Sequence, residues 1–188
     1  MPVYTPRNNM QLVNSCSLPL DFIRLTLKTF SWGTFEFKKG VKFMKLNNLV
    51  MLNWDPSPTG QQDGVHYTIS STDDVEEIMV DRMKEHTDEF WVTYLTPSGG
   101  VHAFLLSHSM LPIEAAPMME DMQCDKLYIK MNLKGNYFGV RISPKLGRKG
   151  DYVASYWKTF GNPELALPEH LETLRIKESY IKGAKYLT

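Results

Sequence analysis

Two oxygen-bearing side chains, Asn53 and Asp55, follow the apolar run at positions 49–52. Side chains two positions apart in a strand point to the same face, so these two would lie together and Trp54 would lie on the opposite face. Hard divalent cations prefer such oxygen ligands. The pair therefore predicts a cation site at the end of a strand. The alternative is structural, because Asp55 could simply cap the turn that begins at Pro56.

A glycine-rich segment, TPSGGVH at positions 96–102, is the second group of interest. Gly99 and Gly100 would let the backbone approach a ligand closely, and free amide groups together with the Ser98 hydroxyl would suit a phosphate. His102, just inside the next apolar segment, could donate a hydrogen bond to the same phosphate. The alternative is an ordinary hairpin turn followed by a structural histidine.

A basic segment spans positions 126–150 and contains no acidic residue. Within it, Arg141 and Lys145 could clamp phosphate groups, the first as a planar fork and the second as a point charge. Aromatic residues interleave with the basic ones, a composition suited to stacking on nucleobases. The alternative is a solvated basic face with aromatic residues in the core. The residues that could follow a nucleic-acid backbone are Lys130, Lys134, Arg148 and Lys149.

Several other kinds of active site are excluded by their missing motifs. The histidines lack the HExxH spacing and no CxxC pair exists, which argues against a zinc site. Neither a Walker A loop nor a GxSxG elbow is present. The two cysteines, Cys16 and Cys124, have no partner motif for nucleophilic catalysis and are too few for a disulfide scaffold.

The elements that must position these residues alternate irregularly between helix and strand. Hydrophobic periodicity and turn residues predict two hairpins, which favours an α+β fold with a mixed or antiparallel sheet flanked by helices. The predicted helices are 18–32, 71–86, 110–123 and 168–186. The predicted strands are 45–54, 90–95, 101–107, 127–133 and 137–143.

Length and composition favour a single folded unit. The chain has 188 residues, of which 43% are hydrophobic and 22% charged, with 21 basic residues balancing 21 acidic ones. These are ordinary globular proportions. We expect an irregular arm at 1–17 and one α+β domain at 18–188. Without an apolar leader or a membrane-spanning run, we expect a soluble, cytoplasmic protein that makes no membrane contact.

Taken in order, the three groups resemble the archaeo-eukaryotic primase superfamily, in particular the small primase-polymerase domains of viruses, plasmids and mobile elements. That family has an apolar strand ending in an acid-x-acid pair, then a Ser-Gly-x-x-His type of motif, then a strand that carries a third acid. Here these positions fall on Asn53-Trp54-Asp55, on Ser98-Gly99-Gly100-Val101-His102 and on Asn132. The resemblance covers about residues 45–160.

The resemblance implies a primase-polymerase-like core with an RRM-like sheet and template-directed nucleotidyl transfer in DNA replication, with the host cytoplasm as the location if the protein is viral. Asp55 would be catalytic and hold Mg²⁺ or Mn²⁺, with Asn53 and Asn132 as weaker metal ligands. His102, also catalytic, would bind the triphosphate together with Ser98, Gly99, Gly100, Arg141 and Lys145. The expected partners are a single-stranded template, an NTP or dNTP, and a helicase or other replication protein.

The chain departs from the family pattern at two of the three acidic positions, which here are Asn53 and Asn132. Two-metal nucleotidyl transfer uses anionic ligands, and each missing charge would remove several kcal/mol of attraction for a cation. Three readings follow. Asp55 and the triphosphate suffice, another acid such as Asp63 or Asp125 has taken over, or catalysis is lost. In the last case the chain would be a non-enzymatic nucleic-acid-binding accessory protein of the same fold.

Overall fold

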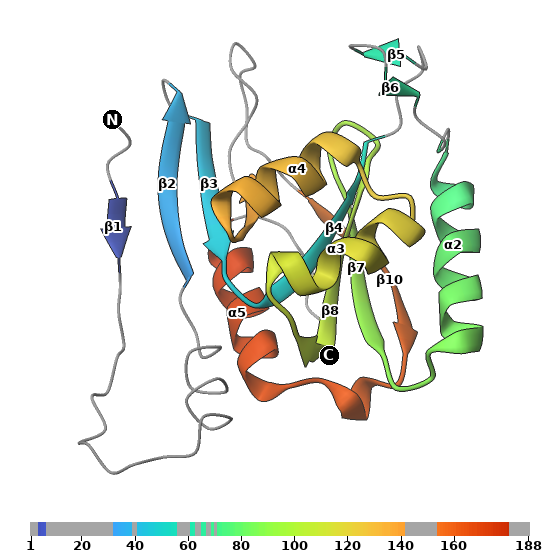
Figure 1. Ribbon diagram of the computed structural model, residues 1–188. Coiled ribbons are helices and arrows are strands. Elements are labelled where there is room, and N and C mark those ends of the chain that lie inside the picture. The colour runs from blue at the N-terminus through green and yellow to red at the C-terminus, as the bar shows by residue number, and fades with distance from the viewer. Residues whose placement is uncertain are drawn as a thin grey trace.

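A computed structural model of the protein has a mixed α+β fold, in which antiparallel sheets are flanked by helices (Figure 1). It describes residues 4–6, 32–38, 41–55, 61–62, 65–66, 69, 71–141 and 154–180.

The main sheet has four strands in the order β10-β7-β8-β4, all paired antiparallel. These strands are β4 (Leu49–Trp54), β7 (Phe90–Leu95), β8 (Val101–Ser109) and β10 (Ser155–Gly161). The first three are almost wholly buried, which explains their continuous apolar runs. β10 is a more exposed end strand with a bulge between Tyr156 and Thr159.

A second antiparallel sheet has the order β1-β2-β3-β9. Its strands are β1 (Tyr4–Pro6), β2 (Trp32–Lys38), β3 (Val41–Leu46) and β9 (Phe138–Arg141). Only Asn47 and Asn48 separate β3 from β4, so the chain passes directly from one sheet to the other. A separate small hairpin pairs β5 (Gln61–Gln62) with β6 (Val65–His66).

Four described α-helices and one 3-10 turn flank the main sheet. They are α2 (Thr72–Glu85), α3 (Pro112–Asp121), α4 (Lys126–Gly135), η1 (Pro163–Leu165) and α5 (Pro168–Tyr180). α3 and α4 lie in front of the main sheet in the view of Figure 1, and α2 lies beside β10. No helix of the described residues is long and apolar enough to cross a membrane.

The core is centred on the main sheet and the helix faces that pack against it. Trp54, Trp91 and Phe104 are among its largest fully buried side chains, and α2 contributes Val75 and Met79. α2 begins at Ser71, which forms a capping box with Asp74. The Ser71 backbone N–H donates to the Asp74 carboxylate at 2.9 Å, and the Asp74 N–H donates to the Ser71 hydroxyl at 3.3 Å. Burial of one apolar face and a satisfied first turn together fix this helix.

The largest error of the sequence prediction concerns residues 127–143. We predicted a hairpin with a strand at 127–133, but residues 126–135 form α4. Asp125 caps that helix by accepting from the Tyr128 N–H at 2.8 Å, and Asn136 ends it in the left-handed region at φ 53°. The alternating apolar residues suggested a strand, yet the buried pair Ile129 and Asn132 follows a helical spacing.

Several of the other predicted elements are confirmed within the described residues. The helix at 71–86, the strand at 90–95 and the strand starting at 101 are confirmed. The predicted strand 45–54 is instead two strands, β3 and β4, and β10 was not predicted. The predicted arm at 1–17 includes β1, while the predicted helix at 18–32 lies outside the described residues except for Trp32, which begins β2.

Candidate functional site

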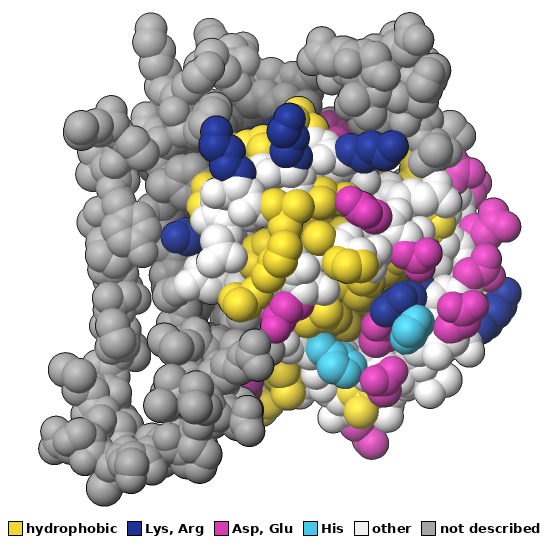
Figure 2. Space-filling view, viewed as in Figure 1, with side chains coloured by type: hydrophobic (Ala, Val, Ile, Leu, Met, Phe, Trp, Pro, Cys, Tyr) yellow, Lys and Arg dark blue, Asp and Glu magenta, His cyan; other side chains and the backbone are white. Residues whose placement is uncertain are grey.

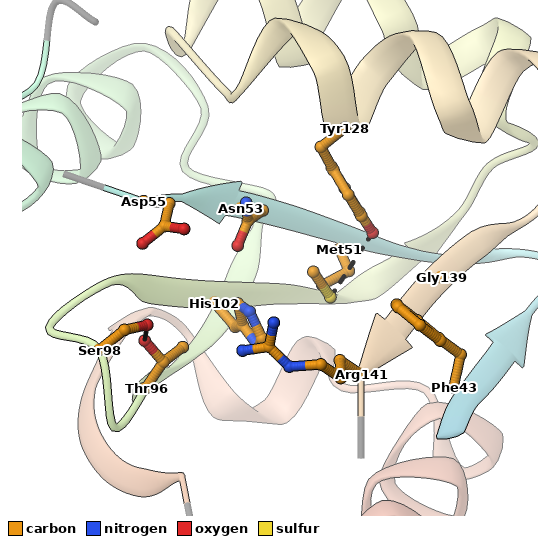
Figure 3. Close-up of a pocket in the computed structure, with 10 residues that line it drawn as sticks. All are labelled: Phe43, Met51, Asn53, Asp55, Thr96, Ser98, His102, Tyr128, Gly139 and Arg141. Carbon is orange, nitrogen blue, oxygen red and sulfur yellow. Dashed lines mark hydrogen bonds between the residues drawn. The ribbon is translucent and has the colours of Figure 1, made fainter. Parts of the chain in front are cut away.

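A pocket opens where β4, the turn between β7 and β8, and β9 meet, and two of the three predicted motifs line it (Figure 3). α4 contributes one wall and β3 another. The lining residues are Phe43, Met51, Asn53, Asp55, Thr96, Ser98, His102, Tyr128, Gly139 and Arg141.

Asn53 and Asp55 face the pocket from the end of β4, as the strand alternation predicted. Trp54 points the other way into the core, is 1% exposed, and donates from its indole nitrogen to the Met122 carbonyl at 2.9 Å. This anchor fixes the rotation of the strand end, so the two oxygen-bearing side chains must face the pocket together.

The backbone of Asn53 is held by the linker between α3 and α4. Its N–H donates to the Cys124 sulfur at 3.3 Å, and its carbonyl accepts from the Cys124 thiol at 3.4 Å and from the Asp125 N–H at 2.9 Å. Burial raises the pKa of the Cys124 thiol to about 12, so it stays protonated at neutral pH. Cys124 therefore serves as a structural clamp on the pocket rather than as a nucleophile.

The turn between β7 and β8 explains both glycines of the second motif. Gly99 adopts φ +84°, a conformation that favours glycine. A Cβ on Gly100 would lie 2.6 Å from the Trp54 carbonyl oxygen, so only glycine lets the turn pack against the end of β4. The Asp55 side of the pocket and the Ser98 side are brought together by this close contact.

The hydrogen bonds inside this turn correct one expectation. We expected the glycine amides to receive a phosphate, but the Gly99 N–H donates to the Thr96 carbonyl at 3.0 Å and the Gly100 N–H donates to the Thr96 hydroxyl at 2.9 Å. The Thr96 hydroxyl also lies 3.1 Å from the Ser98 hydroxyl. Ser98 is exposed, and it is the hydroxyl-bearing residue at the tip of the turn that lines the pocket.

His102 and Arg141 lie together on one side of the pocket (Figure 3). His102 is 6% exposed and pairs in register with Asn53 on β4 and with Tyr94 on β7. Arg141 ends β9 opposite Phe43, and its guanidinium reaches toward His102 (Figure 3). A cationic fork beside an imidazole suits an anionic ligand in this pocket.

Tyr128 closes the pocket on the α4 side. Its hydroxyl donates to the Met51 sulfur at 3.5 Å. Burial raises the pKa of Tyr128 well above its usual value, and the Asn132 side chain offsets only part of that rise, so the phenol stays neutral. The sequence analysis assigned no pocket role to Tyr128, Phe43 or Met51. Tyr128 and Phe43 were missed because they lie on α4 and on β3 before the predicted strand. Met51 lies two positions before Asn53 on β4, so strand alternation could have placed it on the pocket face.

Asn132 does not line the pocket, contrary to what the resemblance implied. It lies on α4 rather than on a strand, is 2% exposed, and accepts the Gly139 N–H at 3.3 Å. Its side chain therefore lies behind the pocket wall, where it ties α4 to β9.

Of the predicted nucleic-acid-binding residues, the two that the structure describes, Lys130 and Lys134, do not line the pocket. Lys130 and Lys134 are exposed, and helical geometry places them on the opposite side of α4 from Tyr128. Lys145, Arg148, Lys149 and Asp63 lie outside the described residues.

The donor set for a divalent cation is small. Asp55 is the one carboxylate among the lining residues, and Asn53 adds a neutral carbonyl oxygen. The neighbouring Asp125 uses a carboxylate oxygen to cap α4. Among the described residues there is no cluster of three histidine, cysteine, aspartate or glutamate side chains that could hold a metal. These residues fit at most one cation whose remaining ligands come from a bound phosphate or from water.

The chain was compared with family models, curated proteins and solved structures, and it matches none of them.

Proposed function

We propose that the protein is a primase-polymerase-like nucleotidyltransferase that binds a nucleoside triphosphate in this pocket and adds the nucleotide to a primer. The observation that carries the proposal is the convergence of two separate motifs. Asn53 and Asp55 meet Ser98 and His102 in one pocket, and the basic Arg141 adds the positive charge that a triphosphate requires.

In this proposal different lining residues bind or orient different parts of the nucleotide. The Arg141 guanidinium and the Ser98 hydroxyl bind phosphate oxygens, and His102 donates a further hydrogen bond to them. Phe43 and Tyr128 offer apolar walls beside this anion site, which suits the sugar and base. Arg141 also supplies the fixed charge opposite the negative charge that develops during phosphoryl transfer.

Asp55 and the Asn53 carbonyl oxygen are the residues that would hold Mg²⁺ or Mn²⁺. When bound, the cation would neutralise phosphate charge during transfer. Because Asp55 is the single carboxylate among the described residues that line the pocket, we expect cation binding to depend strongly on the nucleotide.

The second candidate is a non-enzymatic nucleic-acid-binding replication accessory protein of the same fold. The specific observation that favours it is the small set of metal ligands. Asp55 is the one carboxylate that lines the pocket within the described part of the chain, and Asn132 lies behind the pocket wall. Such a protein would bind nucleotides or single strands without incorporating them.

Nucleotide binding and incorporation, measured on the same variants, test both candidates. Arg141→Ala should weaken binding of a fluorescent NTP or dNTP by at least about tenfold, because a charge-assisted hydrogen bond is lost. The matched control is Lys130→Ala, which removes a positive charge on the far side of α4 and should leave nucleotide affinity unchanged. Equal effects of the two substitutions would refute the pocket as the nucleotide site.

Primer extension separates the enzyme from the accessory protein. With labelled nucleotide and Mg²⁺ or Mn²⁺, wild-type protein should extend a primed single strand, and Asp55→Ala should abolish extension while nucleotide binding persists. Asn53→Asp, which adds ligand charge with little change of shape, should increase extension. If wild type and Asn53→Asp both bind nucleotide and neither incorporates it, the accessory role is the better account.

A further inference from the structure

A basic stripe runs along the outer face of α4. It consists of Lys126, Lys130 and Lys134, which are all exposed and recur at every fourth position, about 6 Å apart along the helix axis. Beside the stripe, Leu127 and Met131 are 61% and 51% exposed. Figure 2 displays basic side chains gathered along α4 at the border of an apolar patch over α3 and α4. The stripe does not line the pocket, so it takes no part in the proposed nucleotide binding there.

An acidic stripe with the same spacing runs along α2. It consists of Glu77, Asp81 and Glu85, all exposed. Val80, on the same face, is the one large exposed hydrophobic residue of the described chain outside α3 and α4. Lys84 also lies on this face and pairs with Asp81 at 2.6 Å. The negative charge of the stripe therefore comes mainly from Glu77 and Glu85, because Asp81 is paired with Lys84.

We propose that the acidic stripe of α2 docks on the basic stripe of α4 in a second copy of this chain. Three basic side chains on α4 and three acidic ones on α2 repeat at the same interval, so they can align along one contact, in which Asp81 is shared with Lys84. Val80 would meet the apolar edge formed by Leu127 and Met131, which removes exposed apolar surface from water. The zero net charge of the chain adds no overall repulsion between copies.

The two surfaces belong to different parts of one chain, which determines the form of the assembly. Each copy offers one α2 and one α4, so a contact between copies leaves an acidic stripe free at one end and a basic stripe free at the other. Such head-to-tail contacts continue into chains or close into rings. A contact of two helices is smaller than a standard protein interface, so we expect weak association that increases with protein concentration and decreases with salt.

Charge reversal on each stripe tests the proposal without touching the core or the pocket. Sedimentation velocity of the wild type should reveal a mass that rises with concentration at low salt. The α4 variant K126E/K130E/K134E and the α2 variant E77K/D81K/E85K should each weaken self-association by at least about tenfold, since three exposed ion pairs become repulsive contacts. Circular dichroism should confirm that both variants keep the wild-type helix content.

Mixing the two reversed variants provides the decisive arm. In the α4 variant both stripes are acidic, and in the α2 variant both are basic, so neither variant should associate with itself. In the mixture every contact between the two variants joins an acidic stripe to a basic one, so the mixture should associate as the wild type does. The control variant E164K/E172K reverses two exposed acids near the C-terminal end and should behave as wild type. A wild type that stays monomeric at every concentration, or a mixture that does not associate, overturns the proposal. The basic stripe is a nucleic-acid surface instead if the wild type is monomeric and binds single-stranded DNA, and the K126E/K130E/K134E variant loses that binding.

Discussion

Asn132 is a buried amide in a place where a carboxylate would be costly. Its oxygen accepts the Gly139 N–H and its side chain lies beside the buried phenol of Tyr128. The resemblance places an acid at this position, whereas the observed surroundings favour a neutral side chain. A neutral asparagine therefore suits this buried position between α4 and β9 better than an acid would.

We accordingly expect Asn132→Asp to destabilise the fold by about 1–3 kcal/mol, because it buries a charge without an ionic partner. Urea denaturation measures this loss. Asn53→Asp is the matched control, since Asn53 faces the open pocket and its replacement should cost much less. An Asn132→Asp protein as stable as wild type, with higher Mn²⁺ affinity, would return this residue to the metal site.

Cys124 provides a second test at the residue scale. It is 3% exposed, and burial raises its pKa to about 12, so both access and ionisation oppose its reaction. In a Cys16→Ser background, we expect no measurable reaction of the native protein with a disulfide-exchange reagent at neutral pH. Addition of denaturant should release one reactive thiol. Rapid labelling of the native protein would mean that the linker between α3 and α4 opens easily.

At the scale of an element, the turn between β7 and β8 depends on two glycines for different reasons. Gly99 has a positive φ with open space around it, whereas Gly100 lies against the backbone of Trp54. Gly99→Ala should cost about 1 kcal/mol through backbone strain. Gly100→Ala should cost more, about 1–3 kcal/mol, because the turn must move away from β4.

Thermal or urea denaturation ranks the two variants, and nucleotide binding adds a second measurement. Gly100→Ala should also weaken nucleotide affinity, since it separates Ser98 from Asp55. If Gly99→Ala is the more damaging substitution on both measurements, the close packing of this turn on β4 is not what holds the pocket together.

The elements also indicate how far sequence reasoning reached. The helix predicted at 71–86 and the strands predicted on either side of the TPSGG turn rest on local patterns, and α2, β7 and β8 confirm them. α4 was missed because Leu127, Met131 and Leu133 are exposed, so apolar residues did not mark the buried face. The same error moved Asn132 onto a strand. Tyr128 and Phe43 could not be assigned to the pocket, because their positions depend on contacts distant in sequence.

At the scale of the whole molecule, α5 is attached to the main sheet through a buried histidine. His170 is fully buried, and its ring lies 3.0 Å from the Leu106 carbonyl and 3.1 Å from the Ser109 hydroxyl. Burial is the main cause that lowers its pKa below the ordinary value of 6.5, and His108 adds to that shift. The Leu106 carbonyl and Glu169 oppose it.

The lowered pKa means that the unfolded chain takes up this proton more readily than the native protein. Stability from His170 is therefore present above pH 6.5 and is lost as pH falls below that value toward the native pKa. We expect the free energy of unfolding of the wild type to decrease over this range. His170→Asn should lower stability at neutral pH and flatten this dependence. An unchanged slope in the variant would assign the pH effect to other groups.

The bulge in β10 has a consequence for how copies of the molecule can meet. The Thr93 hydroxyl fills the bulge, accepting the Lys158 N–H at 3.2 Å and donating to the Lys158 carbonyl at 2.8 Å, while the Lys158 ammonium pairs with Glu76 on α2. A strand that is kinked and carries a charged residue at its kink is a poor template for the backbone of another chain. At the opposite edge of the sheet, the backbone of Asn53 is already hydrogen-bonded: its N–H donates to the Cys124 sulfur and its carbonyl accepts from the Asp125 N–H. Both edges of the main sheet thus resist the strand-to-strand growth that leads to fibrils.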